Sequence, residues 1–305
     1  MTNKKEHPFK NSKMPLPMKL YFMALSLTFK ILEVVSPKLS GKLALRLFMI
    51  PPNAPPPRRE GKIREEAKLS YRSMNNRNIA VRVWDDESTK ENAPTVLLSH
   101  GWAGRTSQFL EFIDPLVAAG YRVVGADIPA HGDSSGKHTN MLDATQVLST
   151  IAKEFGPLEA IIGHSFGTGT ILLGMDKFGI DAPKVILIGA YSRVSFIINL
   201  FSDVFNLNQA SRDAMKQAGS EKFADTYGIE WDWESIAPVN TIKSYQGKLL
   251  FIHDETDHEV PMDEVTELHQ SKPDAEVIIT SGFGHRRILR NQDVVDSVLE
   301  FIKTS

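Results

Sequence analysis

From residue 63 onward, short runs of apolar residues alternate with longer runs that mix apolar and polar positions. The short runs have the length of buried strands, and the longer ones repeat apolar residues at helical spacing. Strands that are apolar throughout, with helices between them, are typical of a mostly parallel sheet covered on both faces. The predicted strands are residues 95–99, 121–126, 159–162, 185–188, 248–253 and 276–280. The predicted helices are residues 108–119, 143–155, 167–178, 263–270 and 293–303.

Two more strands are predicted ahead of these, over residues 63–74 and 79–84. They flank Asn75-Asn76-Arg77-Asn78, a polar segment that favours a turn. The pair therefore predicts an antiparallel hairpin. Because ligands of a parallel sheet bind beyond the carboxyl ends of its strands, candidate chemistry is expected in the loops that follow those ends.

The beginning of the chain follows a different pattern. Residues 16–33 predict a helix with one narrow polar stripe, which holds Lys19, Ser26, Lys30 and Glu33. The rest of its surface is a wide apolar arc made of Leu16, Leu20, Phe22, Met23, Leu25, Leu27, Phe29 and Ile31. Its uncharged run, residues 20–29, is far shorter than the about 20 residues that a bilayer requires, so no transmembrane helix is predicted.

A second, shorter helix is predicted after Pro37. Lys38, Lys42 and Arg46 step by four along one of its faces, and leucines occupy the opposite face. Residues 51–57 contain five prolines and predict an extended linker.

These two basic amphipathic helices allow two interpretations. In the first, residues 15–50 make peripheral contact with a membrane of anionic lipid. In the second, which we favour slightly, the helices pack on an apolar patch of the main domain or on a second subunit. A cleaved secretory signal is disfavoured because no small-residue cleavage site follows the apolar run. We therefore expect a cytoplasmic protein, with peripheral membrane contact as the open alternative.

Composition excludes several classes of protein. Lys and Arg number 35 against 37 Asp and Glu, a net charge of −2, so no nucleic-acid partner is expected. The absence of Cys excludes disulfides, thiol catalysis and cysteine-ligated metal sites. The charge is unevenly distributed: residues 1–64 carry a net charge of +10, and the remainder carries −12.

One pentapeptide stands where a predicted strand meets a predicted helix. Gly163-His164-Ser165-Phe166-Gly167 follows the strand at 159–162 and begins the helix at 167–178. A serine in such a sharp turn presents its hydroxyl at the sheet edge, and the flanking glycines let neighbouring segments approach closely. Ser165 is therefore the candidate nucleophile. The pentapeptide alone is weak evidence, so the prediction depends on three other segments.

The three segments also follow predicted strand ends. His100-Gly101-Trp102 predicts a turn in which the backbone N–H of Trp102, with that of Phe166, forms an oxyanion hole. Serine, then acid, then histidine, each beyond a successive strand, is an order that can bring three side chains together across a parallel sheet. The candidate acids are Asp254, Glu255 and Asp257, and the candidate histidine is His285 in the loop at 282–285.

With these segments in view, the chain resembles the α/β-hydrolases of the serine type, esterase- and lipase-like, over about residues 63–305. Five segments match that family in order: residues 100–102, 127–134, 163–167, 253–261 and 282–286. The resemblance implies an α/β-hydrolase fold with a mostly parallel central sheet, helices on both faces and a helical cap insertion. It selects Asp257 over Asp254 and Glu255, giving a triad of Ser165, Asp257 and His285. Serine at the elbow, where relatives that open epoxides or displace halide carry Asp, disfavours those two reactions.

Nearly sixty residues separate the strands at 185–188 and 248–253, so we place the cap insertion at about residues 192–240. The domain division is then a helical extension with its linker, residues 1–57, and a catalytic domain, residues 58–305. In this family such an insertion covers the active site, which implies an apolar pocket. The candidate pocket residues are His100, Phe196 and Phe201.

The expected function is hydrolysis of small to medium apolar carboxylic esters through an acyl-enzyme, with no cofactor and no metal. The same triad would also serve a thioesterase, a lipase, an acyltransferase or a cofactor-free perhydrolase. A hydrolase-like protein that binds a ligand without turnover is a third class, which an intact serine, aspartate and histidine disfavour. The oligomeric state stays open.

Overall fold

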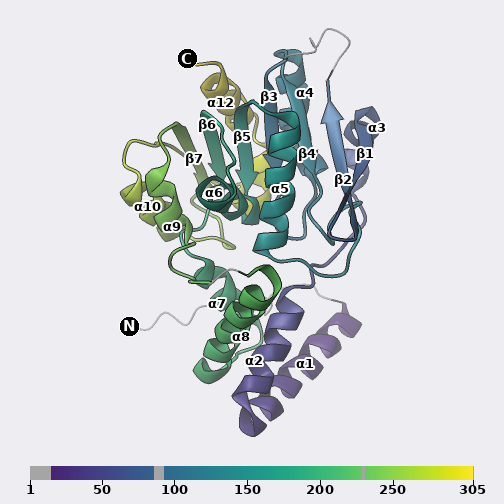
Figure 1. Cartoon of the computed structure of the whole chain (residues 1–305), viewed down its shortest axis with the longest axis vertical. Helices are drawn as coiled ribbons and strands as arrows, with labels where there is room; N and C mark the ends of the chain where they lie inside the picture. The colour runs from purple at the N-terminus through teal and green to yellow at the C-terminus, as the bar shows by residue number, and fades with distance from the viewer. Residues whose placement is uncertain (1–14, 86–92, 229–230, 305) are drawn as a thin grey trace. The chain divides into compact units, whose positions relative to one another are not determined.

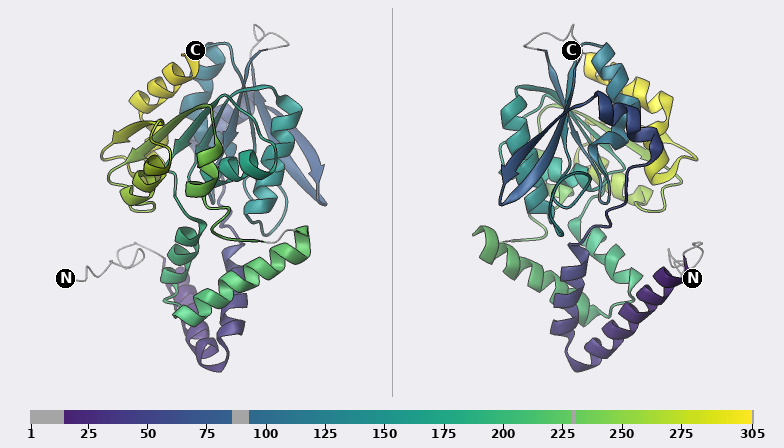
Figure 2. Two further views of the ribbon diagram at one scale, coloured as in Figure 1. Left: turned by 60° about the vertical axis from the view of Figure 1, so that its left-hand side comes forward. Right: turned by 90° about the vertical axis from the view of Figure 1, so that its right-hand side faces the viewer.

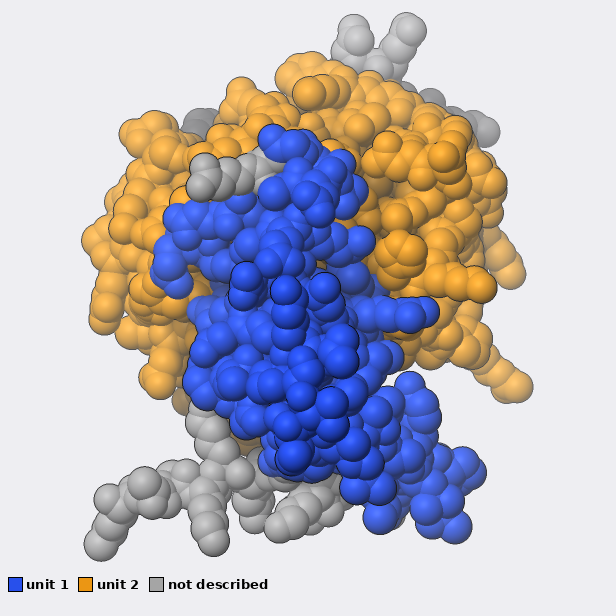
Figure 3. All heavy atoms as spheres, turned by 60° about the horizontal axis from the view of Figure 1, so that its bottom comes forward, with its two compact units in different colours: residues 1–49, 194–234 blue, residues 50–193, 235–305 orange. Residues whose placement is uncertain are grey.

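The computed structural model describes residues 15–85, 93–228 and 231–304. The chain forms two compact units, which Figure 3 distinguishes by colour. One unit contains Ile50–Arg193 and Ser235–Ser305, and the other contains Met1–Met49 and Val194–Glu234. We call them the sheet unit and the helical unit.

The sheet unit is built around one sheet of eight strands, in the order β1-β2-β4-β3-β5-β6-β7-β8 (Figure 1). Neighbouring strands from β4 to β8 run parallel, whereas β1 pairs with β2, and β2 with β4, in antiparallel fashion. The strands are β1 (Lys68–Met74), β2 (Arg77–Trp84), β3 (Thr95–Ser99), β4 (Arg122–Ala126), β5 (Leu158–His164), β6 (Lys184–Ile188), β7 (Lys248–Asp254) and β8 (Glu276–Thr280).

Successive strand residues face opposite sides of the sheet, so each apolar strand supplies two cores. Leu97 packs with helices α5 and α6 in one core, while its neighbours Val96 and Leu98 pack with α4 and α12 in the other. The views of Figure 2 show helices on both sides of the sheet. The helices of this unit are α3 (Gly61–Glu66), α4 (Leu110–Ala118), α5 (Met141–Phe155), α6 (Phe166–Lys177), α9 (Pro238–Thr241), α10 (Met262–Ser271), α11 (Gly284–Arg287) and α12 (Gln292–Lys303).

These elements confirm the predicted fold class, and all six predicted buried strands are present within two residues. The hairpin is also present, and its turn is formed by Asn75 and Asn76, both at positive φ. The prediction that its first strand begins at residue 63 is wrong. Residues 61–66 form α3, in which Ile63 is buried and its carbonyl accepts a hydrogen bond from the Trp84 indole at 2.6 Å.

The helical unit joins the beginning of the chain to the insertion. Its helices are α1 (Leu16–Val35), α2 (Pro37–Phe48), α7 (Val194–Val204) and α8 (Gln209–Tyr227). Phe29, Leu45 and Met215 share its apolar core, in which the Phe205 ring lies 5.1 Å from that of Phe29. Gly41 lies where α2 meets α8, and a methyl group there would stand 2.5 Å from the Met215 nitrogen.

This grouping differs from the division into an extension of residues 1–57 and a domain of residues 58–305. The apolar faces of α2 and α8 can be removed from water by covering each other, so segments about 170 positions apart form one core. The second interpretation of the N-terminal helices was that they pack on an apolar surface. The structure shows such packing for α2 and for one side of α1, and the surface is that of the insertion.

None of the helices in the described part of the chain has both the length and the apolar character needed to cross a membrane.

Candidate active site

Ser165 lies in the turn between β5 and α6, with φ 53° and ψ −121°. A non-glycine residue in this region of the backbone is strained and persists only where its surroundings hold it. Its N–H donates to the Ile188 carbonyl at 2.9 Å, and its own carbonyl accepts from the Thr168 N–H at 2.9 Å. The half-buried Ser165 is thereby held at the carboxyl edge of the sheet, as the pentapeptide predicted.

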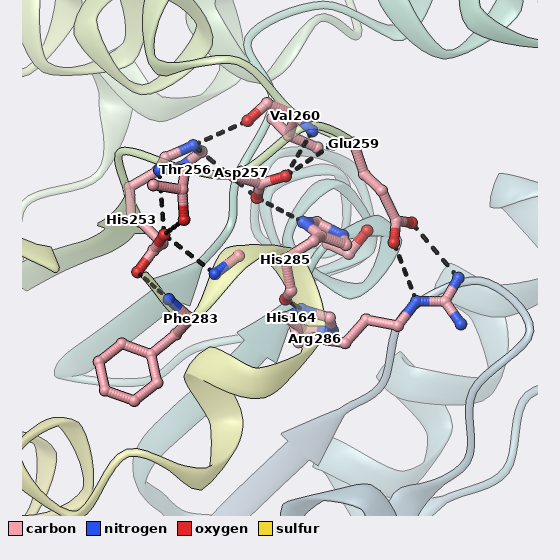
Figure 4. A network of polar contacts seen from close by, with 12 residues as sticks. His164, His253, Thr256, Asp257, Glu259, Val260, Phe283, His285 and Arg286 are labelled. Atoms are coloured by element: carbon pink, nitrogen blue, oxygen red, sulfur yellow. Dashed lines mark hydrogen bonds and ion pairs between the residues drawn. The ribbon is translucent and has the colours of Figure 1, made fainter. Parts of the chain in front are cut away.

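His285 and Asp257 meet at the same edge. The Nδ1–H of His285 donates to Oδ2 of Asp257 at 2.6 Å, and both side chains are buried (Figure 4). The other carboxylate oxygen, Oδ1, accepts from the backbone N–H groups of Glu259 and Val260, each at 2.8 Å. With its proton on Nδ1, the neutral imidazole has Nε2 available as a base.

Charge and hydrogen bonding keep Asp257 ionised. Burial alone would raise the pKa of Asp257, but the hydrogen bond and the charge of His285, together with the two backbone donors, outweigh it and lower the pKa. The carboxylate can therefore orient the imidazole and stabilise the imidazolium without taking its proton.

Residues that adjoin or hydrogen-bond Ser165 contact His285 or precede a residue that does. Ile188, whose carbonyl receives the Ser165 N–H, precedes Gly189, and a methyl group at Gly189 would lie 3.1 Å from Cε1 of His285. His164, the other neighbour of Ser165, has its ring centroid 4.8 Å from that of His285 and its Nε2 2.8 Å from the His285 carbonyl. The carbonyl is an acceptor, so Nε2 of His164 carries the proton, and burial first, then the charge of His285, lowers the pKa of His164 to about 3.

Asp254, the competing candidate acid, accepts hydrogen bonds from backbone N–H groups and hydroxyls around the loop that carries His285. Its Oδ1 accepts from the Gly284 N–H at 2.9 Å and from Thr256, and its Oδ2 accepts from the Phe283 N–H at 3.1 Å and the Thr280 hydroxyl at 2.8 Å. Burial would raise the pKa of Asp254, but these hydrogen bonds hold it well below the usual range. Asp254 therefore ties down the loop that carries His285, while Asp257 meets the imidazole.

Glu255 also serves this loop. Its carboxylate accepts from the Ser281 hydroxyl at 2.5 Å, and its N–H donates to the Thr280 carbonyl at 2.8 Å. Of the three acids, Asp257 is the one that the structure bonds to His285.

The turn at His100-Gly101-Trp102 lies against the serine. A methyl group at Gly101 would stand 3.1 Å from the Ser165 Cβ, and the rings of Trp102 and Phe166 lie 5.3 Å apart. The two residues with the candidate oxyanion donors are therefore neighbours beside Ser165. Ala103, which follows, adopts φ 57°.

The turn is held by a residue whose role the sequence did not reveal. The Ala103 N–H donates to Nε2 of His131 at 3.0 Å, and the Nδ1–H of His131 donates to the Pro129 carbonyl at 3.0 Å. Burial first, then the charge of His100, lowers the pKa of His131 to about 3, so the ring stays neutral and keeps Nε2 as an acceptor. In the sequence, His131 stands only as one residue of the matched segment 127–134. Its place two residues after Pro129 in a motif loop was the available signal.

Asp127 is a second residue whose role sequence reasoning missed. It is fully buried, and its Oδ1 accepts from both the N–H and the hydroxyl of Thr106, at 2.8 and 3.0 Å. Its Oδ2 receives the guanidinium of the buried Arg82 at 3.0 Å and the Asp133 N–H at 2.9 Å. Asp127 thus joins the loop at 127–134 to the segment that follows the Trp102 turn.

His100, expected in a substrate pocket, is a structural residue of this turn instead. Its Nδ1–H donates to the Gly101 carbonyl at 2.9 Å, and its Nε2 accepts the Ile128 N–H at 3.0 Å. With 1% of its surface exposed and both ring nitrogens engaged, it has no polar atom to offer a substrate. Burial, as the largest effect, lowers its pKa.

The two phenylalanines proposed for the pocket belong to α7 in the helical unit. Phe201 packs in the core of that unit, with ring centroids 5.4 Å from Phe48 and 5.1 Å from Phe205. Phe196 is half-buried. Both stay predictions as substrate contacts.

The stretch around His253 contains several histidines and acidic residues, which are common metal ligands. The Nε2–H of His253 donates to the Val260 carbonyl at 2.9 Å. Among the described residues, no group of three His, Asp or Glu side chains is arranged to hold a metal ion.

Comparisons with known proteins agree with this architecture. A family model described as the alpha/beta hydrolase fold matches residues 94–224. A relative from Cupriavidus necator, the dihydrolipoyllysine-residue acetyltransferase component of the acetoin cleaving system, is 32% identical over 137 residues, which are 43% of this chain. The match spans 34% of that relative, so the chain covers about a third of its length.

Two solved structures show the same fold at low sequence identity. A thioesterase domain from the curacin biosynthetic pathway has a TM-score of 0.54 at 17% identity, over 78% of this chain and 99% of its own. A membrane phospholipase A has a TM-score of 0.59 at 16% identity, over 81% of this chain and 92% of its own. The sheet order, the strained serine turn and these matches confirm the resemblance: the chain has the α/β-hydrolase fold.

Proposed function

We propose that this chain is a serine hydrolase that cleaves carboxylic esters of small to medium apolar substrates through an acyl-enzyme. The observation that carries the proposal is the 2.6 Å hydrogen bond from His285 to Asp257 beside a serine held at positive φ. These are the three groups that acyl transfer requires: a nucleophile, its base, and a carboxylate that orients the base.

In the first half of the reaction, Nε2 of His285 takes the proton of the Ser165 hydroxyl while Oγ attacks the ester carbonyl carbon. The carbonyl oxygen becomes an oxyanion, which the N–H groups of Trp102 and Phe166 stabilise. The C–O bond to the alcohol then breaks, and the proton on His285 leaves with that alcohol.

In the second half, water attacks the acyl-enzyme and gives its proton to His285. The second tetrahedral intermediate collapses, Ser165 recovers its proton from His285, and the carboxylic acid departs. Asp257 remains ionised throughout, because its pKa is held below the ordinary value. Every step is carried out by side chains and backbone of this chain, with no cofactor.

Apolar substrates are proposed from the composition of the insertion. The α7 sequence, VSFIINLFSDV, is largely apolar and includes Phe196 and Phe201, which stay predictions as substrate contacts. Turnover of esters of increasing chain length would measure the size of substrate that the site accepts.

Transfer of the acyl group to an acceptor other than water is the second candidate function. It is favoured by the match to the acetyltransferase component, which is confined to about a third of that protein. Thioester and lipid ester cleavage use the same steps with another leaving group, so a substrate panel separates them.

The test combines labelling with turnover. The pure protein is treated with a fluorophosphonate, the modified peptide is found by mass spectrometry, and p-nitrophenyl esters and acyl thioesters of increasing chain length are assayed. We expect labelling at Ser165 alone and ester turnover that depends on chain length. Ser165→Ala should lower turnover at least about 1,000-fold with folding intact, whereas Ser297→Ala, on the exposed side of α12, should leave it unchanged.

Other outcomes have defined meanings. Wild-type turnover in Ser165→Ala would rule out this serine as the nucleophile. A folded protein that neither labels nor turns over any ester would contradict catalysis and favour the ligand-binding class.

A further inference from the structure

One side of α1 exposes an unbroken row of large apolar residues. Leu16 is 69% exposed, Met23 67%, Leu27 63% and Val34 88%, and none is covered by another helix of its unit. We call this set the α1 stripe, and its members are Leu16, Leu20, Met23, Leu27, Ile31 and Val34. They recur every three or four residues over the length of the helix.

The α1 stripe is distinct from the side of the helix that packs in the core. At about 100° per residue, the six positions fall within about 80° of the helix circumference. Phe22, Leu25 and Phe29 lie on a different side and pack in the core of the helical unit. The helix is therefore apolar on two sides, which explains the unusually wide arc in its sequence. Packing uses only one of them.

Single exposed apolar residues are common on protein surfaces. A continuous row of this length is uncommon and marks a binding surface. The charges on α1 and on α2, which packs against α1, indicate what binds there. Lys19 and Lys30 border it on one edge, and Lys38, Lys42 and Arg46 are exposed on α2.

Negative charge is nearly absent from this surface. Glu33 is the only acidic residue between positions 15 and 49. Its side chain is 6% exposed, and it is engaged by the Lys30 ammonium at 3.0 Å and the Asn208 N–H at 2.6 Å. The exposed charged side chains of α1 and α2 are therefore all basic.

We propose that α1 docks on a membrane surface of anionic lipid, lying parallel to it. The α1 stripe enters the boundary of the acyl chains, and the lysines and Arg46 meet the headgroups. A second copy of this chain fits less well, because stripe-to-stripe packing would bring together two surfaces of net positive charge, each with five basic residues and one acidic residue between positions 15 and 49. The proposal goes beyond the proposed function and does not depend on it, since binding is measured without turnover.

Deletion of residues 1–57 is a poor test, because it removes α2 and Phe29 from the core of the helical unit. Surface substitutions in the full chain avoid this problem. The test variant is Leu20→Gln/Leu27→Gln/Ile31→Gln, since Gln is a good helix former. The control variant changes three exposed apolar residues of the sheet unit, Leu69→Gln/Tyr71→Gln/Ile279→Gln.

Binding is measured by co-sedimentation with vesicles of phosphatidylglycerol and phosphatidylcholine, and with vesicles of phosphatidylcholine alone. The wild type and the control variant should bind the anionic vesicles, more weakly at about 1 M than at about 0.1 M salt. The stripe variant should bind at least about 100-fold more weakly. Unchanged circular dichroism would show that the variant is folded.

Three results would overturn the proposal. The first is equal vesicle binding by the stripe variant and the wild type. The second is equal binding of the wild type to neutral and anionic vesicles. The third is a wild-type dimer in sedimentation velocity that binds no vesicles and becomes monomeric in the stripe variant, which would identify a second copy as the occupant.

Discussion

At the scale of single residues, Asp254 and Asp257 show how two equivalent side chains take different roles. Asp254 is the last residue of β7, Asp257 follows three positions later, and both are buried. Asp254 accepts hydrogen bonds from the backbone around the histidine loop, whereas Asp257 accepts a hydrogen bond from the imidazole Nδ1–H of His285. One carboxylate positions the loop, and the other orients the ring.

Their substitutions should therefore have different effects. Asp257→Asn should lower kcat about 10,000-fold with little change in stability, because the amide favours the wrong imidazole tautomer. Asp254→Asn should mainly destabilise the fold, by about 1–3 kcal/mol, because its carboxylate acceptors are lost. Kinetics and thermal unfolding of both variants check this. The reverse pattern, with turnover abolished only in Asp254→Asn, would exchange the two assignments.

Asp254 also predicts a pH dependence of stability. Its pKa is lowered in the folded state, so its stabilising charge is fully present above the unfolded pKa of about 3.9 and is lost as pH falls through the folded value. The difference in unfolding free energy between the wild type and Asp254→Asn should shrink below about pH 4, by about 1.4 kcal/mol per pH unit. Urea unfolding at pH 7 and pH 3 measures it. A difference that is constant with pH would contradict the assigned cause.

At the scale of elements, two loops at the sheet edge support each other. The turn with Trp102 receives its hydrogen-bond partner from the loop after β4, through Ala103 and His131. Trp102 also contacts His131, with ring centroids 5.1 Å apart. The position of the candidate oxyanion donor therefore depends on a residue nearly thirty positions away.

His131→Phe tests this dependence, because it keeps an aromatic ring and removes the acceptor Nε2. We expect kcat to fall about tenfold with KM little changed, since a shifted N–H weakens stabilisation of the oxyanion rather than substrate binding. Ester kinetics give the two parameters separately. The exposed His138→Ala serves as the control. A change confined to KM, or none at all, would remove His131 from the oxyanion argument.

At the scale of the whole molecule, the chain forms its helical unit from its beginning and from an insertion in its middle. At Gly41, α2 lies close to the α8 backbone, so that a methyl group there would stand 2.6 Å from the Ala214 carbonyl carbon. We therefore expect the stability of the helical unit to depend on the absence of a side chain at Gly41.

Gly41→Ala should reverse the usual sign of this substitution. In a helix interior, replacing Gly by Ala ordinarily stabilises by about 0.5–1 kcal/mol. Here backbone must move, so we expect destabilisation of about 1–3 kcal/mol. Hydrogen exchange should speed up in α2 and α8 while the strands of the sheet unit stay protected. Gly61→Ala is the matched control, because a methyl group there meets no atom within 4 Å. If α2 and α8 exchanged at the same rates in Gly41→Ala as in Gly61→Ala, the close packing at Gly41 would be contradicted.

Much of the sheet unit could be predicted from the sequence because the relevant signals are local. Apolar runs such as residues 95–99 and 185–188 have the length of strands buried on both faces, and both are strands. The serine turn was recognisable because Ser165 stands directly between a strand and a helix. The prediction of a strand over residues 63–67 is wrong, because a short segment of mixed polarity has no clear strand or helix period. Ile63 is buried from a helix as well as it would be from a strand.

The tertiary structure alone decided the contacts between distant segments. The resemblance to a family had selected Asp257 over Asp254, but only the path of the loops after β7 and β8 brings one carboxylate to His285 and turns the other toward backbone donors. His100 could not be assigned from sequence either, because both ring partners depend on how neighbouring turns fold. The sequence determined that α1 is apolar around most of its circumference. Which side is covered depended on α7 and α8, because burial requires a partner surface that periodicity in one segment cannot specify.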